Sequence, residues 1–445
     1  MRRTKKITKH KFISIQKIFW LISLIFLLGS CLLYGTRFIK LYKENEKKYG
    51  NKNTGDLLIT KIDDNNEKNN NYKVINGEHY FINNADNNYL EYSNILFRII
   101  KINQNGEIVI ISDNPITSLA YGKDKKQEDS YIYRWLNDND EELTGILEKS
   151  LNKSNDYLIK SLSCNDKYDS LTNTECKDIN YDYTISLLSS KDYINVGDKN
   201  SYINNNQYFY LESKNNDDKI WYINPEGKAL TSFGEDIIGV KPVLTIKNNI
   251  SYIKGDGTKD NPYIIEKENG LLGSYVKIDN YIFRIYQIND SDVRIILNNE
   301  LENEYSYSNI SSYHNDFNVN SAAYYLNNNF LNQLSCKDKI KEVNWSNGYY
   351  GTESNYDYKE SIKSTINSKV AMPSIGDIFL NNISSNYFIM TGTKPNGMLV
   401  YTIGSNYKIT TKSVTGKSKL VPTLSIDKEL LKEGTGLKDN PYIIK

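Results

Sequence analysis

The chain has 445 residues, more than one hydrophobic core of ordinary size encloses, so two or three domains are expected. Hydrophobic residues make up 39% of the sequence and 37 positions are Tyr, which excludes a largely disordered chain. The formal net charge of +1 hides an asymmetry, because residues 1–43 carry ten Lys or Arg and no acidic residue. The remainder therefore carries −9, which excludes a nucleic-acid-binding surface there.

The first predicted element is a membrane-spanning helix over residues 18–36. This segment has no charged residue, and a helix of its length, rising about 1.5 Å per residue, crosses a hydrocarbon core of roughly 30 Å. The basic residues 1–17 predict a short cytoplasmic tail, because the more basic flank stays inside. We therefore expect a single-pass protein of the cell membrane whose residues from 37 onward are extracytoplasmic.

Two other interpretations of this segment remain open. A cleaved signal peptide would need a small-residue cleavage site followed by polar sequence, and none follows Ser30. A lipoprotein signal would acylate Cys31, since residues 28–31 resemble a lipobox, although apolar residues continue past this Cys. Both alternatives also place the rest of the protein outside the cytoplasm.

An internal repeat organises the remainder of the chain, after a polar stalk predicted at residues 37–71. Two segments share the pattern Gly-x-Gly-x-Lys-Asp-Asn-Pro-Tyr-Ile-Ile, and two further pairs match upstream in the same order. The matching pairs are 255–265 with 434–444, 241–246 with 421–426, and 95–100 with 281–286. One domain has been duplicated, with copies predicted at 72–267 and 268–445, and the repeat length is too great for a solenoid.

The pattern within each copy predicts strands, a helix, long irregular loops and further strands. Alternating apolar residues around a polar turn predict an opening β-hairpin, and Leu and aromatic residues at helical spacing follow it. The predicted elements are hairpins at 97–111 and 281–297, helices within 130–136 and 321–334, and strands at 220–223 and 399–403. This order predicts an α+β fold with a mainly antiparallel sheet.

Several segments of the first copy carry a family resemblance. They are the Phe-Arg-Ile strand at 97–99, Trp-Leu-Asn at 135–137, Leu-Leu-Ser-Ser-Lys-Asp-Tyr at 187–193, Trp-Tyr-Ile-Asn-Pro-Glu-Gly at 221–227 and Gly-Val-Lys-Pro-Val-Leu at 239–244. Together they resemble an uncharacterised family of bacterial surface domains that is C-type-lectin-like and distantly similar to the formylglycine-generating sulfatase-modifying fold. The resemblance is weaker in the second copy, where Val400 replaces Trp221. It implies two tandem C-type-lectin-like extracellular modules after a transmembrane anchor, and it implies no activity.

Cysteine usage fits an extracellular location. Cys164 and Cys176 lie in one polar loop of the first copy, at a separation that allows a disulfide. Such a loop closure would stabilise the fold by roughly 3 kcal/mol in the chain-entropy model. We predict this disulfide, with two free thiols as the alternative. The second copy has only Cys336 and no partner in its loop.

No catalytic, cofactor or metal motif is found in the sequence. The three His residues (His10, His79 and His314) form no zinc spacing and lie near no nucleophile pattern, so we expect no enzyme. Acidic residues of the repeated turn, Asp256, Asp260 and Asp439, would suit calcium, but Gly, Asp and Asn are also what a tight turn prefers. We therefore predict no catalytic, cofactor or metal residues.

Aromatic residues are the remaining candidates for ligand contact. Trp135 and Trp221 are predicted to be core residues, whereas Tyr349 and Tyr350, set among Ser, Asn and Gly, are predicted to lie at the surface. The resulting hypothesis is a membrane-anchored recognition or adhesion protein that presents two lectin-like modules to a glycan or an envelope protein. The alternative is a structural or accessory cell-envelope subunit with no small-molecule ligand.

Overall fold

The computed structural model describes residues 57–445 except 67–69, 123–128, 165, 173–175, 181–182, 267, 269, 315–318 and 352–355. The predicted cytoplasmic tail, the membrane-spanning helix and most of the stalk lie outside the described residues. Within the described part, no helix is both long enough and apolar enough to cross a membrane. The end of the predicted stalk is a helix, α2 (Leu58–Asn66), which packs its apolar side on the first repeat and donates a hydrogen bond from Asn65 to Tyr263 Oη.

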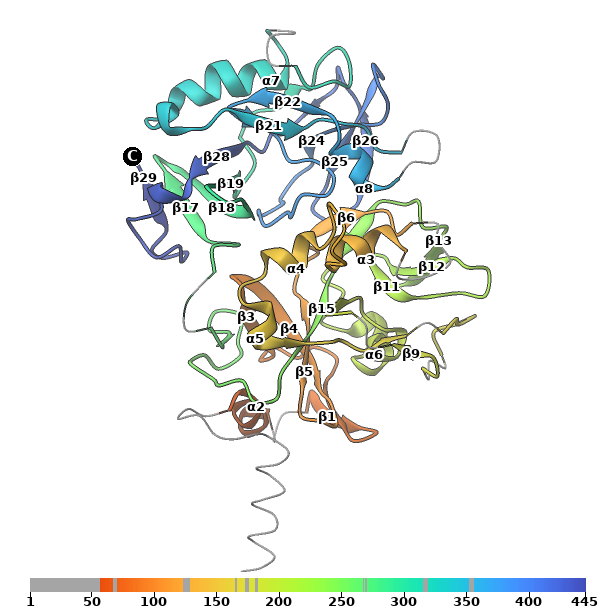
Figure 1. Ribbon diagram of the computed structural model, residues 1–445. Helices are drawn as coiled ribbons and strands as arrows, with labels where there is room; N and C mark the ends of the chain where they lie inside the picture. Colours follow the sequence, from red (N-terminus) through yellow and green to blue (C-terminus); the bar gives the residue numbers. More distant parts are fainter. Residues whose placement is uncertain are drawn as a thin grey trace, which may run out of the picture. The chain divides into compact units, whose positions relative to one another are not determined.

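The first repeat is built on one mainly antiparallel sheet (Figure 1, orange to green). Its central strands are β3 (Tyr89–Tyr92), β4 (Ile95–Ile102), β5 (Ile108–Ser112) and β15 (Val243–Ile246), and β16 (Tyr263–Ile264) lies parallel to β3. Shorter strands extend it: β1 (Tyr72–Ile75), β2 (Glu78–Phe81), β7 (Leu158–Ile159) and β10 (Ile185–Ser186). Strand β5 is buried at every position, which explains its continuous apolar run.

The second repeat contains a sheet with the same strand order (Figure 1, teal to blue). Its strands are β17 (Tyr275–Ile278), β18 (Tyr281–Ile288), β19 (Asp292–Leu297), β28 (Thr423–Asp427), β23 (Val370–Ala371) and β29 (Tyr442–Ile444), and β29 lies parallel to β17. Even the irregularities coincide, because β4 has a bulge before Lys101 and β18 has one before Gln287. The six strands of the second sheet therefore each have an equivalent in the first, which has β1, β2 and β7 in addition.

Each repeat also carries a separate three-stranded antiparallel sheet. In the first repeat it consists of β11 (Phe209–Lys214), β12 (Ile220–Ile223) and β13 (Ala229–Ser232), and in the second of β24 (Tyr387–Gly392), β25 (Leu399–Ile403) and β26 (Ile409–Ser413). The remaining strands pair in twos: β6 (Thr117–Leu119) with β14 (Ile238–Val240), β8 (Ser163–Cys164) with β9 (Ile179–Asn180), β20 (Tyr305–Ser306) with β27 (Lys417–Ser418), and β21 (Val343–Ser346) with β22 (Thr365–Ser368).

The helices are few and short. Besides α2 they are α3 (Tyr131–Leu136), α4 (Ile146–Ser150), α5 (Ser154–Tyr157), α6 (Ser190–Asn195), α7 (Ala322–Tyr324) and α8 (Tyr358–Ser361), with short 3-10 and π segments. The predicted antiparallel sheets are confirmed. The helical share is smaller than an α+β fold implies, since long loops occupy the space between the sheets, and the chain is a mostly-β protein.

The matched Leu-Asn segments have the same structural role in both repeats. In the first, the Asn137 side chain donates to Ile185 O at 2.8 Å and accepts from Ile185 N at 2.8 Å. In the second, Asn327 makes the same pair of bonds to Val370, at 2.8 and 3.0 Å. One amide thus ties the helix to the edge strand of the main sheet, which accounts for the Asn in both copies.

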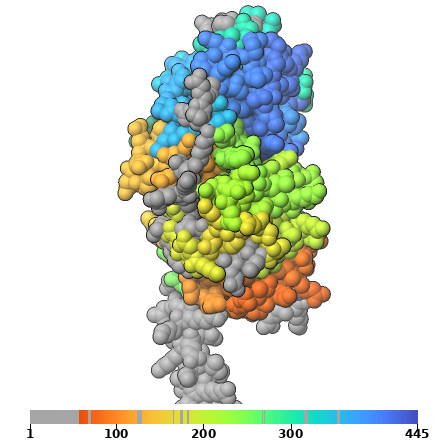
Figure 2. Space-filling view, turned by 90° about the vertical axis from the view of Figure 1, so that its right-hand side faces the viewer, coloured from red at the N-terminus to blue at the C-terminus, as the bar shows by residue number. Residues whose placement is uncertain are grey.

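Buried contacts join the two repeats. The fully buried Trp135 donates from Nε1 to Gly376 O at 2.9 Å, and Phe379 N donates to Ile116 O at 2.6 Å. Arg134 and Asp357 form an ion pair of 2.9 Å across the same boundary. Figure 2 shows the light-blue surface of the second repeat lying directly against the orange and green surface of the first. Residues 55–445 accordingly form one compact unit.

Candidate functional site

A cavity of about 450 Å³ opens where the two repeats meet. Both repeats contribute to its walls, and the lining is mixed in charge. Its charged lining residues are Glu91, Asp113, Lys259, Asp260, Arg284 and Lys438. A volume of this size lies within the range of roughly 300–1,000 Å³ that is usual for small-molecule sites.

The repeated turn places a lysine in this cavity from each copy. Gly255 and Gly434 adopt φ of +104° and +100°, and an added Cβ would lie 1.9 and 2.1 Å from the carbonyl oxygen of the Pro in the same turn. Only glycine fits these positions, so both turns keep one shape. The matching lysines of the two turns, Lys259 and Lys438, both line this cavity.

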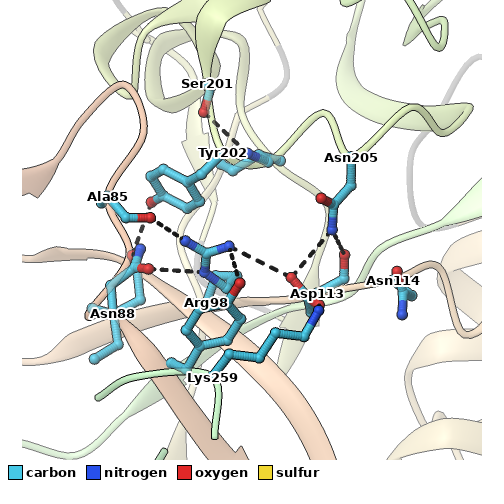
Figure 3. A network of polar contacts seen from close by, with 12 residues as sticks. Ala85, Asn88, Arg98, Asp113, Asn114, Ser201, Tyr202, Asn205 and Lys259 are labelled. Carbon is cyan, nitrogen blue, oxygen red and sulfur yellow. Dashed lines mark hydrogen bonds and ion pairs between the residues drawn. The ribbon is translucent and has the colours of Figure 1, made fainter. Parts of the chain in front are cut away.

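The wall from the first repeat includes Asp113, which forms a buried ion pair with Arg98 (Figure 3). Arg98 Nη1 lies 3.6 Å from Asp113 Oδ1, and both side chains are only 4% exposed. The guanidinium also donates to Asn88 Oδ1 at 2.8 Å and stacks 3.8 Å from the ring centre of Tyr89. Lys259 approaches the same carboxylate, with Nζ 3.8 Å from Oδ2. The charge of Asp113 is thus compensated from two sides.

The wall from the second repeat places Arg284 in the position equivalent to Arg98. Its guanidinium stacks 4.3 Å from the ring centre of Tyr275 and donates to Asn94 O of the first repeat at 2.8 Å. It also donates to Gly273 O, to Tyr275 Oη and to Leu380 O. In the part of the chain that the structure describes, Arg284 forms no ion pair.

The missing carboxylate follows from one sequence difference. Asp113 N donates to Leu96 O at 2.9 Å, and in the second repeat Asn298 N donates to Ile282 O at 2.8 Å, so Asn298 occupies the position of Asp113. Burial lowers the pKa of Arg284, and Tyr275 and Glu91 oppose that shift. Burial also raises the pKa of the Glu91 carboxyl, partly offset by Arg284 and Lys254. Among the described residues, Arg284 thus feels the charge of Glu91 without forming an ion pair with it, while the lining as a whole has three cations and three carboxylates.

A buried lysine lies behind the wall of the first repeat. Lys241 is 1% exposed and donates from Nζ to Ile203 O at 2.7 Å. Burial lowers its pKa to about 7, although Asp113 acts in the opposite direction. The matched segment of the second repeat has Val421 at this position. The first repeat therefore holds Arg, Asp and Lys where the second holds Arg, Asn and Val.

The residues predicted from the sequence lie elsewhere. Cys164 and Cys176 are joined as a disulfide, with Asp166 beside them; these three residues group closely enough for a metal ion, but disulfide sulfurs are not thiolate ligands. Tyr349 is half-buried, with its hydroxyl 2.6 Å from Ser312 Oγ.

The surface position predicted for Tyr350 is wrong. Its side chain is 0% exposed, and its hydroxyl oxygen accepts a hydrogen bond of 2.9 Å from Ala120 N of the first repeat. The polar residues around Tyr350 do not indicate this, because its partners, among them Tyr401 of its own repeat and Ala120 of the first, lie far from it in the chain. Trp135 is buried as predicted, and Trp221 is half-buried, donating from Nε1 to Tyr168 O.

The sequence shows that charged residues of the cavity occupy matching positions in the two repeats, but it does not show that they lie close together. Arg98 and Arg284 stand at matching positions of matched strands, and Lys259 and Lys438 at matching positions of matched turns. Only the packing of one repeat on the other brings Arg284 and both lysines to one space. No protein-family model, no curated protein and no solved structure matches this chain.

Proposed function

We propose that the chain is a membrane-anchored, extracytoplasmic recognition protein that binds an acidic glycan in the cavity between its two repeats. The observation that carries this proposal is Arg284, a stacked and partly buried guanidinium that lines the cavity and has no carboxylate partner among the described residues. A guanidinium forms charge-assisted hydrogen bonds with a carboxylate. Lys259 and Lys438 add positive charge to the same lining.

The other lining groups suit a sugar. Asn94, Asn114 and Asn381 provide amide groups, and Tyr275 and Tyr407 provide aromatic surface. Side-chain amides both donate and accept hydrogen bonds, as hydroxyl-rich ligands require. The carboxylates of Glu91 and Asp260 accept hydrogen bonds from hydroxyl groups, so a ligand with one acidic group and several hydroxyls matches the mixed lining.

The extracytoplasmic location and the C-type-lectin-like fold are parts of the same proposal. The predicted anchor at residues 18–36 and the Cys164–Cys176 disulfide support the location, because disulfides persist in oxidising compartments. The fold assignment is supported by the terminal strand of each repeat, which lies parallel to β3 in the first repeat and to β17 in the second, and by the separate three-stranded sheet.

The test is binding of the full chain, purified in detergent, to a panel of neutral and acidic oligosaccharides. We expect binding to acidic members and a loss of at least about tenfold in the variant Arg284→Gln, since a charge-assisted hydrogen bond contributes roughly 1.5–3 kcal/mol. Lys277→Gln is the matched control, because it removes one positive charge from an exposed position of β17. Equal binding by both variants would reject the site, and no binding to any oligosaccharide would favour the envelope-subunit alternative.

A further inference from the structure

A second cluster of charged side chains, away from the cavity, lies in the first repeat. Lys101 of β4 meets Asp192 of α6 and Glu78 of β2, with Nζ 2.8 Å from Asp192 Oδ1 and 3.0 Å from Glu78 Oε1. The three side chains are only 10%, 11% and 13% exposed. An amine and two carboxyl groups are thus held in contact with little access to water.

A buried tyrosine completes the cluster. The Tyr80 hydroxyl donates to Asp192 Oδ1 at 2.5 Å and lies 3.1 Å from Glu78 Oε2. Burial and the neighbouring Asp192 and Glu78 raise the pKa of Tyr80 far above its usual value, so it keeps its proton and remains a donor. A donor at a carboxyl oxygen polarises the carboxyl group and makes its carbon a better electrophile.

The positions of the amine and the carboxyl are fixed by the backbone. Lys101 follows the bulge of β4, and Asp192 lies in the first turn of α6, where its backbone N–H donates to Ser189 Oγ at 3.0 Å. Reacting groups held in contact in this way behave as if present at a very high concentration. The cluster therefore has the geometry of a reactive pair as well as that of an ion pair.

We propose that Lys101 and Asp192 are joined by an intramolecular isopeptide bond, with Glu78 as the proton carrier. The neutral Nζ attacks Cγ of the protonated Asp192 carboxyl group and forms an Nζ–Cγ bond. Glu78 accepts a proton from Nζ and delivers it to the departing hydroxyl group, so the Cγ–O bond breaks and one water molecule leaves. Atoms and electrons balance without an oxidant or cofactor.

The charges of the cluster permit this step. Burial lowers the pKa of Lys101, but Asp192 and Glu78 outweigh burial and raise it overall, so the ion pair is the resting state before reaction. The neutral pair differs from it only by the transfer of one proton across a 2.8 Å hydrogen bond. Condensation removes the positive charge of Lys101 and the negative charge of Asp192 together. Glu78 retains an ion pair with Lys191, whose Nζ lies 3.7 Å from Oε2.

The second repeat provides an internal contrast. The register places Gln287 at the position of Lys101. Asp377 corresponds to Asp192 by sequence, since each follows a Ser by three residues, in Ser-Ile-Gly-Asp at 374–377 and Ser-Ser-Lys-Asp at 189–192. An amide nitrogen is not a nucleophile, so only the first repeat forms the bond. The bond would close a loop between positions 91 residues apart and tie α6 to the centre of the main sheet.

Intact mass spectrometry of the full chain tests the proposal. After reduction of the disulfide, the wild-type chain is expected to be lighter than its sequence mass by one water molecule, and a protease digest to contain a branched peptide joining the Lys101 and Asp192 segments. Lys101→Arg and Glu78→Gln are expected to restore the full mass, whereas the control Lys191→Arg keeps the loss. A wild-type chain with its full sequence mass would overturn the proposal, and a bridged Glu78→Gln variant would overturn the role of Glu78.

Discussion

The two repeats have main sheets of the same topology but treat buried charge in opposite ways. In the first repeat Arg98 faces Asp113, and Lys101 contacts Asp192. In the second repeat Arg284 stands in the place of Arg98 without a carboxylate partner among the described residues. The same strand position thus gives a compensated pair in one copy and an available cation in the other.

The positions equivalent to Lys101 and Asp192 also differ in charge between the repeats. The second repeat has Gln287 at the position of Lys101, and burial raises the pKa of Asp377 to about 6, against the opposing effects of the Ser374 N–H and of Arg294. A buried charge must be paired or neutralised, or its cost must be met by another interaction. We infer that the first repeat uses its charges internally, whereas the second retains Arg284 for a ligand.

The largest effect is expected from Asp113→Asn, which gives the first repeat the residue found in the second. It leaves Arg98, only 4% exposed, without its carboxylate, and breaking a buried pair in this way costs about 3–5 kcal/mol. Urea denaturation of the full chain in detergent should show this loss. A change below about 1 kcal/mol would mean that the hydrogen bonds from Arg98 to Asn88 Oδ1, Ala85 O and Tyr89 Oη satisfy the guanidinium without Asp113.

The reverse exchange, Asn298→Asp, sharpens the comparison at the cavity. We expect the new carboxylate to pair with Arg284 as Asp113 pairs with Arg98, and to lower affinity for an acidic oligosaccharide at least about tenfold. Stability should remain the same or rise. Unchanged affinity, measured by calorimetric titration, would show that Arg284 does not contact the ligand.

Lys241→Met replaces the buried lysine of the first repeat by an apolar side chain of similar length. Because the folded-state pKa of Lys241 is about 7 and the ordinary value is 10.5, the unfolded chain binds a proton between these pH values that the folded chain does not. The free energy of unfolding of the wild type should therefore rise with pH in this window, by up to about 1.4 kcal/mol per unit.

The variant should lack this rise and be more stable than the wild type by about 1–2 kcal/mol at neutral pH. Denaturation curves recorded at pH 7, 8 and 9 compare the two slopes. Parallel slopes would show that Lys241 keeps its proton throughout, held by Asp113.

Tyr350→Phe tests a single hydrogen bond between the two repeats. The change removes the oxygen that accepts from Ala120 N and leaves a buried donor unsatisfied at the boundary between the repeats, at a cost of about 1–3 kcal/mol. Thermal unfolding should shift down by a few degrees. Tyr349→Phe, at a half-buried neighbour, is the matched control. An equal shift of the unfolding temperature in both variants would show that the hydrogen bond between Tyr350 and Ala120 does not stabilise the boundary.

The sequence predicted local features better than their assembly. The repeated turn, the opening hairpins and the Leu-Asn segments have the structures or matching roles that their patterns indicate, because short-range chemistry determines them. The buried position of Tyr350 and the meeting of Lys259, Lys438 and Arg284 depend on contacts between positions far apart in the chain, which no local pattern encodes.

The two helices predicted from apolar spacing are present. Within 130–136, α3 spans Tyr131–Leu136 and ends where Asn137 binds the edge strand. Within 321–334, the consecutive segments Ala322–Tyr324, Tyr325–Phe330 and Leu331–Gln333 are helical.

The central claim is that Arg284 binds the acidic group of a sugar, and a matched pair of ligands tests it most directly. The full chain is titrated with two oligosaccharides that share every hydroxyl group and differ only in a carboxylate at one terminal sugar. We predict tighter binding of the carboxylate form, a preference that weakens with salt and disappears in Arg284→Gln. Equal affinity of the wild type for both ligands, or a preference that survives the substitution, would contradict the account.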